Sequence, residues 1–178
     1  MGSLTMHTSE MKWRRTPRPT DKERVRQLTE DTGFFSAEEV AIAAELIEER
    51  LAKGETSGYE FLFAEDAHRL LGYACFGRIP GTKTSFDLYW IVVAAERQRR
   101  GIGGALLRRS ERLIQAANGQ RLYIETSSRP QYAATRSFYL RYGYQQAALL
   151  EDFYAPGDSK VIYAKVLPNL LNLSSLSP

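Results

Sequence analysis

One strand, one glycine-rich loop and one helix follow each other in the middle of the chain, and this succession constrains the fold more than any other feature. Residues 85–93, SFDLYWIVV, are rich in β-branched and aromatic side chains, which predicts a buried strand. The loop QRRGIGG follows after a short connection, and a helical pattern then runs to Asn118 and Gly119. A strand that leads through glycines into a helix places free backbone amides at the end of a sheet.

The loop has the chemistry of an anion site. The first turn of a helix exposes about four unpaired amides and carries about half a positive charge, which favours a phosphate. Gly101, Gly103 and Gly104 leave the approach to these amides free of side chains. Arg99 and Arg100 offer guanidinium groups that can bond phosphate oxygens. The segment therefore predicts a diphosphate site, with a flexible connection as the alternative.

Two common nucleotide-binding loops do not fit these residues. A Walker loop needs Lys and then Ser or Thr after its last glycine, whereas Ala105 and Leu106 stand there. A Rossmann loop needs a different glycine spacing and a place near the start of a parallel sheet. Arg108 or Arg109, one or two turns into the helix, could add to the phosphate site, although a solvated helix face would carry the same residues.

The rest of the chain alternates between strand and helix patterns. Helices are expected to begin where Thr20 precedes Glu23 and where Ser36 precedes Glu39, because each pair has the spacing of a capping box. Further strands are expected at residues 11–16, 59–65, 70–78, 121–126, 144–152 and 160–166, and a further helix at residues 130–143. The predicted fold is α/β (α+β mixed sheet), with six or seven strands and helices on both faces.

Length and composition limit the remaining possibilities. A chain of 178 residues is expected to form one domain over residues 11–167, with residues 1–10 as a disordered leader and 168–178 as a tail. The sequence has no apolar run long enough for a bilayer, which favours no membrane association and a cytoplasmic location. A single cysteine and two distant histidines predict no metal site, and a net charge of +3 argues against nucleic acid as a partner.

Two short patterns in this order resemble the GNAT superfamily of N-acetyltransferases. Gln98, Gly101 and Gly103 after the strand match the family's central motif, and the pair Phe138 and Tyr139, followed by Gly143-Tyr144, is similar to its second motif. The order of elements over residues 11–166 is also similar. The resemblance implies a central, mixed and mostly antiparallel sheet flanked by about four helices, and acetyl-coenzyme A (acetyl-CoA) as co-substrate without a metal.

The resemblance also implies roles for individual residues. Strand amides at Ile91, Val92 and Val93 would receive the acetyl carbonyl and the pantetheine arm. Tyr139 would protonate the departing thiolate, for which phenol and thiol pKa values that differ by only about 1.5 units are suitable; a packed core tyrosine is the alternative. The cofactor contacts implied in the loop and the following helices are Gln98, Arg99, Arg100, Gly101, Ile102, Gly103, Gly104, Ala105 and Phe138.

One departure from the family pattern affects the cofactor contacts. Tyr132 stands where the family often has an Asn, and Thr135 where it often has Ala. Tyr132 or Arg136 could contact the cofactor in place of that Asn.

Two carboxylates are candidates for the base that an acceptor amine requires. Freeing an amine with a pKa near 10.4 at pH 7 costs about 4 to 5 kcal/mol. Asp87 stands where many family members carry a catalytic Glu, and Glu125 ends the following strand. The two are not ranked, and for each of them a surface or ion-paired acid is the alternative.

The acceptor is expected between the early helices and the last two strands. Phe34 and Phe35, together with Asp152 and Tyr154, are candidates to line that wall. A hydrophobic staple at the second helix is the alternative for the two phenylalanines. The function implied is transfer of acetyl from acetyl-CoA to a primary amine of a small-molecule or peptidic acceptor by a monomer or homodimer. A noncatalytic acyl-CoA sensor is the other interpretation.

Overall fold

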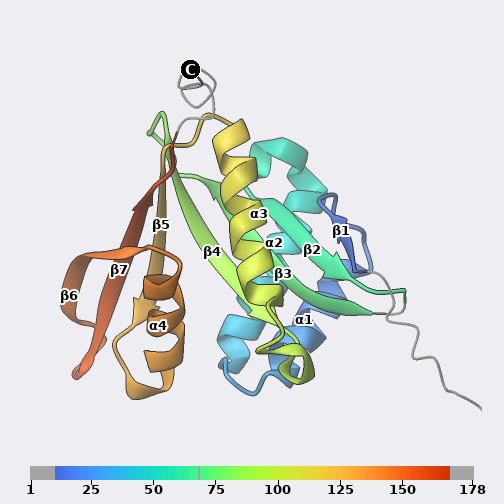
Figure 1. Cartoon of the computed structure of the whole chain (residues 1–178). Helices are drawn as coiled ribbons and strands as arrows, with labels where there is room; N and C mark the ends of the chain where they lie inside the picture. Colours follow the sequence, from blue (N-terminus) through green and yellow to red (C-terminus); the bar gives the residue numbers. More distant parts are fainter. Residues whose placement is uncertain (1–10, 68, 169–178) are drawn as a thin grey trace, which may run out of the picture.

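The computed structural model describes residues 11–67 and 69–168, which form a sheet with helices packed on both faces (Figure 1). The expected leader at 1–10, and the tail beyond residue 168, lie outside the described residues. None of the helices in the described ranges is both long and apolar enough to cross a membrane. The elements in chain order are β1 (Lys12–Arg14), α1 (Asp21–Asp31), α2 (Ala37–Lys53), η1 (Gly54–Ser57), β2 (Glu60–Glu65), β3 (Leu70–Arg78), β4 (Ser85–Val93), η2 (Ala95–Arg97), α3 (Ile102–Ala116), β5 (Arg121–Ser127), η3 (Pro130–Tyr132), α4 (Ala133–Arg141), β6 (Gln145–Ala155) and β7 (Asp158–Val166).

The seven strands lie in the order β1-β2-β3-β4-β5-β7-β6, and every neighbouring pair is antiparallel except β4 and β5. The predicted mixed, mostly antiparallel sheet is therefore confirmed. The bounds of β3 and β4 agree with the predicted ranges 70–78 and 85–93. The last hairpin is tighter than predicted, because Ala155 pairs with Asp158 and leaves only Pro156 and Gly157 in the turn.

The two faces of the sheet carry different helices. Val25 of α1 and Ile47 of α2 pack with Tyr73 and Val92 in one buried cluster. On the other face, α3 and α4 pack with β4, β5 and β7 in a second cluster that contains Leu106. Figure 1 shows α3 lying across one face with α2 behind the sheet. The α1–α2 layer covers the β2–β4 half of the sheet, and no helix of the described ranges covers the same face of β5, β7 and β6.

The sheet opens between β4 and β5. These strands pair only at Ser85–Asp87 with Arg121–Tyr123, after which they separate. The pairing of β3 with β4 is also irregular there, since Cys75 lies opposite Trp90 while Phe76 lies opposite Leu88, so Tyr89 is an extra residue. Such a bulge bends a strand. The consequence is a wedge-shaped gap whose walls are the second half of β4 and the end of β5.

Polar contacts hold α4 against the β5 side of this gap. The Arg136 guanidinium donates to the carbonyl oxygen of Ser127 at 2.8 Å, which fixes the start of the helix to the end of β5. Beyond the helix, the Tyr144 hydroxyl donates to Glu111 of α3 at 2.8 Å, and Lys165 of β7 reaches the same carboxylate at 2.9 Å. Both ends of α4 are thus tied to neighbouring elements.

One of the two predicted capping boxes is present and the other is not. At the start of α2 the Ser36 side chain accepts from the Glu39 amide, and the Glu39 carboxylate accepts from the Ser36 amide. At the start of α1 the prediction was wrong, because Thr20 has a helical backbone conformation and makes no side-chain cap. Glu23 instead pairs with Arg26 at 2.7 Å, three residues along the same helix. This i,i+3 ion pair links two side chains and leaves the first amides of the helix without a side-chain cap from Thr20.

Candidate functional site

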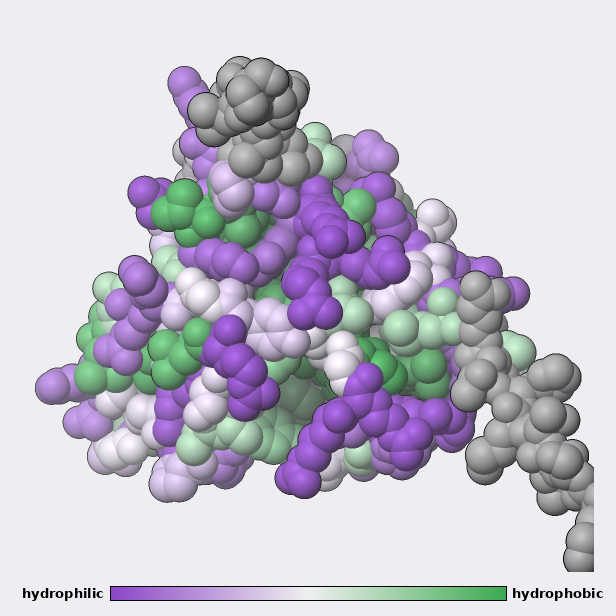
Figure 2. All heavy atoms as spheres, viewed as in Figure 1, coloured by the Kyte–Doolittle hydropathy of each residue, from purple (hydrophilic) through white to green (hydrophobic). Residues whose placement is uncertain are grey.

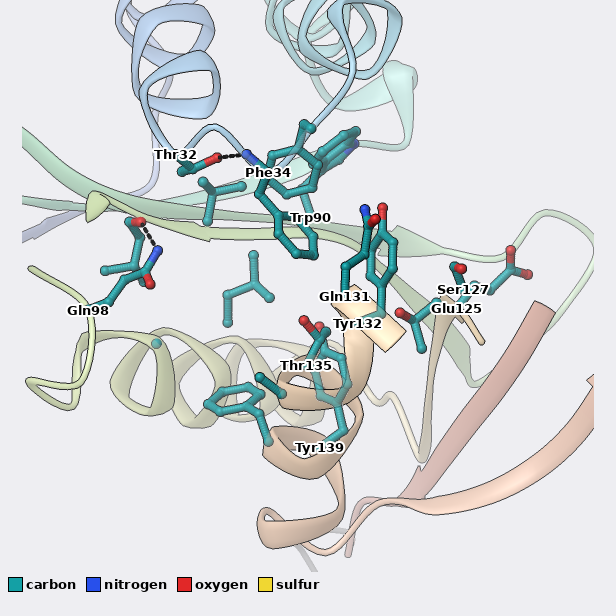
Figure 3. A pocket seen from close by; sticks show the side chains of 18 of the residues that line it. Thr32, Phe34, Trp90, Gln98, Glu125, Ser127, Gln131, Tyr132, Thr135 and Tyr139 are labelled. Carbon is teal, nitrogen blue, oxygen red and sulfur yellow. Dashed lines mark hydrogen bonds between the residues drawn. The ribbon is translucent and has the colours of Figure 1, made fainter. Parts of the chain in front are cut away.

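A cavity of about 1010 Å³ lies where β4 and β5 separate, and Figure 2 shows the surface hollowed there. Its walls come from β4, the loop before α3, the end of β5, α4 and the loop between α1 and α2 (Figure 3). The predicted site residues that line it are Phe34, Phe35, Ile91, Val92, Val93, Gln98, Arg99, Gly101, Gly103, Gly104, Glu125, Tyr132, Phe138, Tyr139 and Tyr154. The predicted site residues that are not part of its lining are Asp87, Arg100, Ile102, Ala105, Arg136 and Asp152.

The edge of β4 turns two backbone amides toward the gap. The amide of Ala94 donates to Leu71 of β3 at 2.9 Å. Because successive amides in a strand point to opposite edges, the amides of Val93 and Ile91 point away from β3 and toward the gap. The Val92 amide points to β3. Two strand donors, not three, are therefore available to a ligand lying between the strands.

The loop before α3 opens the first turn of that helix to the cavity. Arg99 and Gly101 both have left-handed backbone conformations, with φ of 59° and 83°. Gly101 is the N-cap and provides no side chain, so nothing from the cap residue satisfies the amides of the first turn. The Gln98 amide group donates to the carbonyl oxygen of Val93 at 3.3 Å and ties the loop to β4. The Ala105 amide is not free, because it donates to Gly101 at 2.9 Å.

Gly103 and Gly104 in the first turn of α3 lack a side chain for different structural reasons. A Cβ at Gly104 would lie 1.8 Å from the Tyr142 hydroxyl oxygen, so the Tyr142 ring can lie against α3 here only while residue 104 has no side chain. A Cβ at Gly103 would meet Val93 and Phe138 at ordinary distances of 3.6 and 3.7 Å. Gly103 lines the cavity, so the space that it leaves is space for a ligand.

The arginines of this region separate into different roles. Arg99 lines the cavity, and so does Arg141 at the end of α4, which sequence analysis did not single out. Arg108 lies over the ring of Tyr142 at 5.5 Å. Arg109 lies over the ring of Trp13 at 4.3 Å and therefore serves the packing of β1 against α3.

Tyr139 lies at the bottom of the cavity on α4. Its side chain is 4% exposed and its ring contacts those of Phe138, Tyr144 and Tyr163. Burial raises the pKa of its phenol well above the usual value, so the group is protonated at neutral pH. Its hydroxyl makes no hydrogen bond to another of the described residues. The side chain also lines the cavity.

Tyr132 and Arg136 have different positions relative to the cavity. Tyr132 lines it and packs edge-on against Phe34 at 4.7 Å between ring centroids. The Arg136 guanidinium donates hydrogen bonds to the backbone carbonyl oxygens of Ser127 and Arg129, at 2.8 and 2.9 Å. Its observed contacts are structural.

Asp87 and Glu125 lie on the same face of the sheet at the base of the gap. Burial and, to a smaller extent, the Glu125 carboxylate raise the pKa of Asp87 to about 6, against the opposing effect of Lys160. Glu125 lines the cavity, is half exposed and pairs with Lys160 at 2.6 Å. A carboxyl with a pKa near 6 is suited to accept a proton at neutral pH.

Of the four residues predicted to line the acceptor site, three line the cavity and one does not. Phe34, Phe35 and Tyr154 line the cavity. Asp152 shapes the β6–β7 hairpin instead, since its carboxylate accepts from the Gly157 amide at 2.8 Å and its own φ is 49°.

Several lining residues were missed from the sequence. They are Thr32, Glu39, Tyr89, Trp90, Thr126, Ser127, Arg129, Gln131, Ala134, Thr135, Arg141, Tyr142 and Asp158. A signal existed for Trp90, which alternates with Val92 in a strand already assigned. For Asp158 there was none, because its contacts with Ser127 and Arg129 at the end of β5 depend on the pairing of distant strands.

Comparisons with known proteins agree with this architecture. The family model of the acetyltransferase (GNAT) domain matches residues 57–146. The crystal structure of a GNAT-family protein from Desulfovibrio desulfuricans has a TM-score of 0.88 and 42% sequence identity, and the match covers 89% of this chain and 100% of that one. No curated protein matches the sequence.

More distant solved structures share the fold alone. An aminoglycoside 6'-N-acetyltransferase complexed with coenzyme A has a TM-score of 0.69 at 18% identity, with 89% of this chain and 97% of that chain covered. The ribosomal-protein-S18-alanine N-acetyltransferase from Escherichia coli has a TM-score of 0.70 at 18% identity, with 89% and 94% covered. Together with the family model and the Desulfovibrio structure, the strand, loop and helix around the cavity show that this chain belongs to the GNAT acetyltransferase family.

Proposed function

We propose that this protein transfers the acetyl group of acetyl-CoA to a primary amine, by direct attack of the amine while both substrates are bound. The observation that carries the proposal is the continuity of one cavity. It runs from the first turn of α3 along the free edge of β4 to Tyr139 and Glu125 (Figure 3). A ligand with a diphosphate at one end and a thioester at the other would meet a suitable group along its whole length.

The residues of the α3 turn fit a diphosphate. The amides of Ile102, Gly103 and Gly104 belong to the uncapped first turn, and Arg99 and Arg141 add positive charge beside it. Acetyl-CoA would supply an activated acyl group in this cavity. The amides of Ile91 and Val93 are placed to hold a carbonyl oxygen and to stabilise negative charge that develops on it.

Two proton transfers remain, and separate residues are available for them. The amine must lose a proton, for which Asp87, directly or through water, and Glu125 are candidates at the base of the gap. Tyr139 holds the proton that a departing thiolate needs. Burial raises the pKa of this phenol, and the same apolar surroundings would raise that of a thiol, so the transfer does not become steeply uphill.

The reaction itself is tested by measuring free thiol released from acetyl-CoA across a panel of primary amines. We expect thiol release that requires an amine and equals the acetylated amine in amount. If calorimetry shows binding of acetyl-CoA but no amine causes thiol release, the proposed acetyl transfer is contradicted and a noncatalytic sensor is supported.

The two glycines of the α3 turn should respond differently to a side chain. Gly104→Ala should lower the melting temperature of the free protein by several degrees, since the new Cβ overlaps the Tyr142 hydroxyl. Gly103→Val should leave that melting temperature near the wild-type value but weaken acetyl-CoA binding at least tenfold, because it fills the ligand approach. Thermal shift and calorimetry measure both effects.

Ala116→Val on the exposed end of the same helix controls for helix propensity. Wild-type affinity in Gly103→Val would exclude the α3 turn from the cofactor site.

Tyr139→Phe should lower kcat about 100-fold while the KM for acetyl-CoA changes less than about threefold, since only the proton donor is lost. The matched control is Tyr163→Phe, a buried tyrosine that contacts the Tyr139 ring without lining the cavity. Steady-state kinetics of both variants at saturating amine decide the point. Equal kcat values in the two variants would assign thiolate protonation to another group.

The pH dependence of kcat/KM should report the ionisation of the Asp87 carboxyl group. If its carboxylate is the base, kcat/KM reaches its plateau above the pKa of about 6 and falls as the pH drops below that value. Asp87→Asn should remove this acidic limb and lower the plateau. Lys160→Met should move the limb to higher pH, because the ammonium of Lys160 lowers the pKa of Asp87. An unchanged limb in Asp87→Asn would assign it to Glu125 or another acid.

A further inference from the structure

Four aromatic rings form a continuous chain along one side of the cavity. The Tyr132 ring packs on Phe34 at 4.7 Å, Phe34 on Phe35 at 5.1 Å, and Phe35 on Trp90 at 5.2 Å. These residues belong to three separate segments, namely η3, the α1–α2 loop and β4. Figure 3 shows Phe34 and Trp90 on the side of the cavity opposite Thr135 and Tyr139.

The loop that carries two of these rings is held in place before any ligand binds. The Thr32 hydroxyl donates to the Thr29 carbonyl at 2.7 Å and accepts from the Phe34 amide at 3.2 Å. The capping box of Ser36 and Glu39 fixes the other end of the loop. All four rings line the cavity, so the protein maintains a preformed aromatic wall there.

The acidic residues on this side of the cavity are mostly neutralised within the protein. Asp158 pairs with Arg129 at 3.0 Å, and Glu125 pairs with Lys160 at 2.6 Å. Glu39 has no ion pair among the described residues, and its charge raises the pKa of Tyr132 after the larger effect of burial, so it faces the same space. A ligand with several positive charges would find few carboxylates free to match them.

Size limits the acceptor as well. The cavity of about 1010 Å³ includes the edge of β4 and the α3 turn, so it must hold a pantetheine arm as well as the acceptor. Ligand pockets of about 300 to 1,000 Å³ usually enclose one drug-sized molecule. The volume left beside the aromatic wall suits a compact acceptor.

We propose that the acceptor is a small monoamine with an aromatic group, whose ring packs against Phe34, Phe35, Trp90 and Tyr132 while its amine reaches the free edge of β4. This inference rests on the proposed amine acetylation and specifies its substrate class. Aromatic pairs contribute about 0.5 to 1.5 kcal/mol beyond area burial, and the preformed wall lowers the cost of ordering the site.

The first test compares kcat/KM for 2-phenylethylamine, hexylamine, spermidine, an aminoglycoside and a tripeptide with an aromatic first residue. We expect 2-phenylethylamine to exceed each of the others at least tenfold. Phe34→Ala should reduce its kcat/KM at least tenfold and leave the KM for acetyl-CoA within about twofold. Leu51→Ala, an exposed apolar position on α2, is the matched control and should change neither.

The second test measures acceptor binding without turnover. The sequence has two tryptophans, so in a Trp13→Phe variant Trp90 alone reports on the cavity by fluorescence. With coenzyme A bound, 2-phenylethylamine should quench this signal and bind at least tenfold more tightly than spermidine. Equal or reversed affinities, or a kinetic preference for the peptide, polyamine or aminoglycoside, would overturn the aromatic acceptor. Thiol release with those amines would leave the proposed acetyl transfer intact, whereas selective binding of 2-phenylethylamine without thiol release from any amine would contradict only the transfer.

Discussion

The rest of this structure depends on how early β4 and β5 stop pairing. Every other neighbouring pair in the sheet is antiparallel, and these two parallel strands share only three residue pairs. The amides that would have continued the ladder, those of Ile91 and Val93, are left for a ligand. Buried backbone amides require partners, so the gap is stable only as a solvated or ligand-filled site. The position of the cavity and its open strand edge both follow from this one interruption.

The gap has a defined width because its two walls are joined at several points. On the face of the sheet that carries α3, Tyr142 at the end of α4 packs on Gly104, and Glu111 links α3 with β7 through Lys165. The ring contact between Phe34 and Tyr132 joins the α1–α2 loop to the start of α4. These connections replace the missing strand pairs and keep the two halves of the sheet together.

Sequence reasoning was strongest where local pattern decides structure. The limits of β3 and β4, the capping box of α2 and the glycine turn before α3 follow from alternation, side-chain chemistry and helix-end geometry. It was weaker where partners come from distant segments. Arg136 bonds to the backbone at the end of β5, in another element than its own. Asp152 has a local partner, Gly157, but this contact depends on the exact register of the hairpin, which the sequence predicted too short. Glu39 and Asp158 reach the cavity only after the elements pack. The Thr20 cap is missing because Thr20 itself has a helical backbone conformation, which the residue types alone do not reveal.

The two parts of the site are formed by different kinds of group, main-chain amides in one and side chains in the other. The part proposed for acetyl-CoA consists largely of main-chain amides, with glycines that keep the approach to them open. The part proposed for the acceptor consists of side chains on the α1–α2 loop, η3 and β4. Under the proposed function, exchange of a few such side chains would change which amine is accepted while the acyl donor stays the same. This separation permits divergence of specificity at little risk to the chemistry.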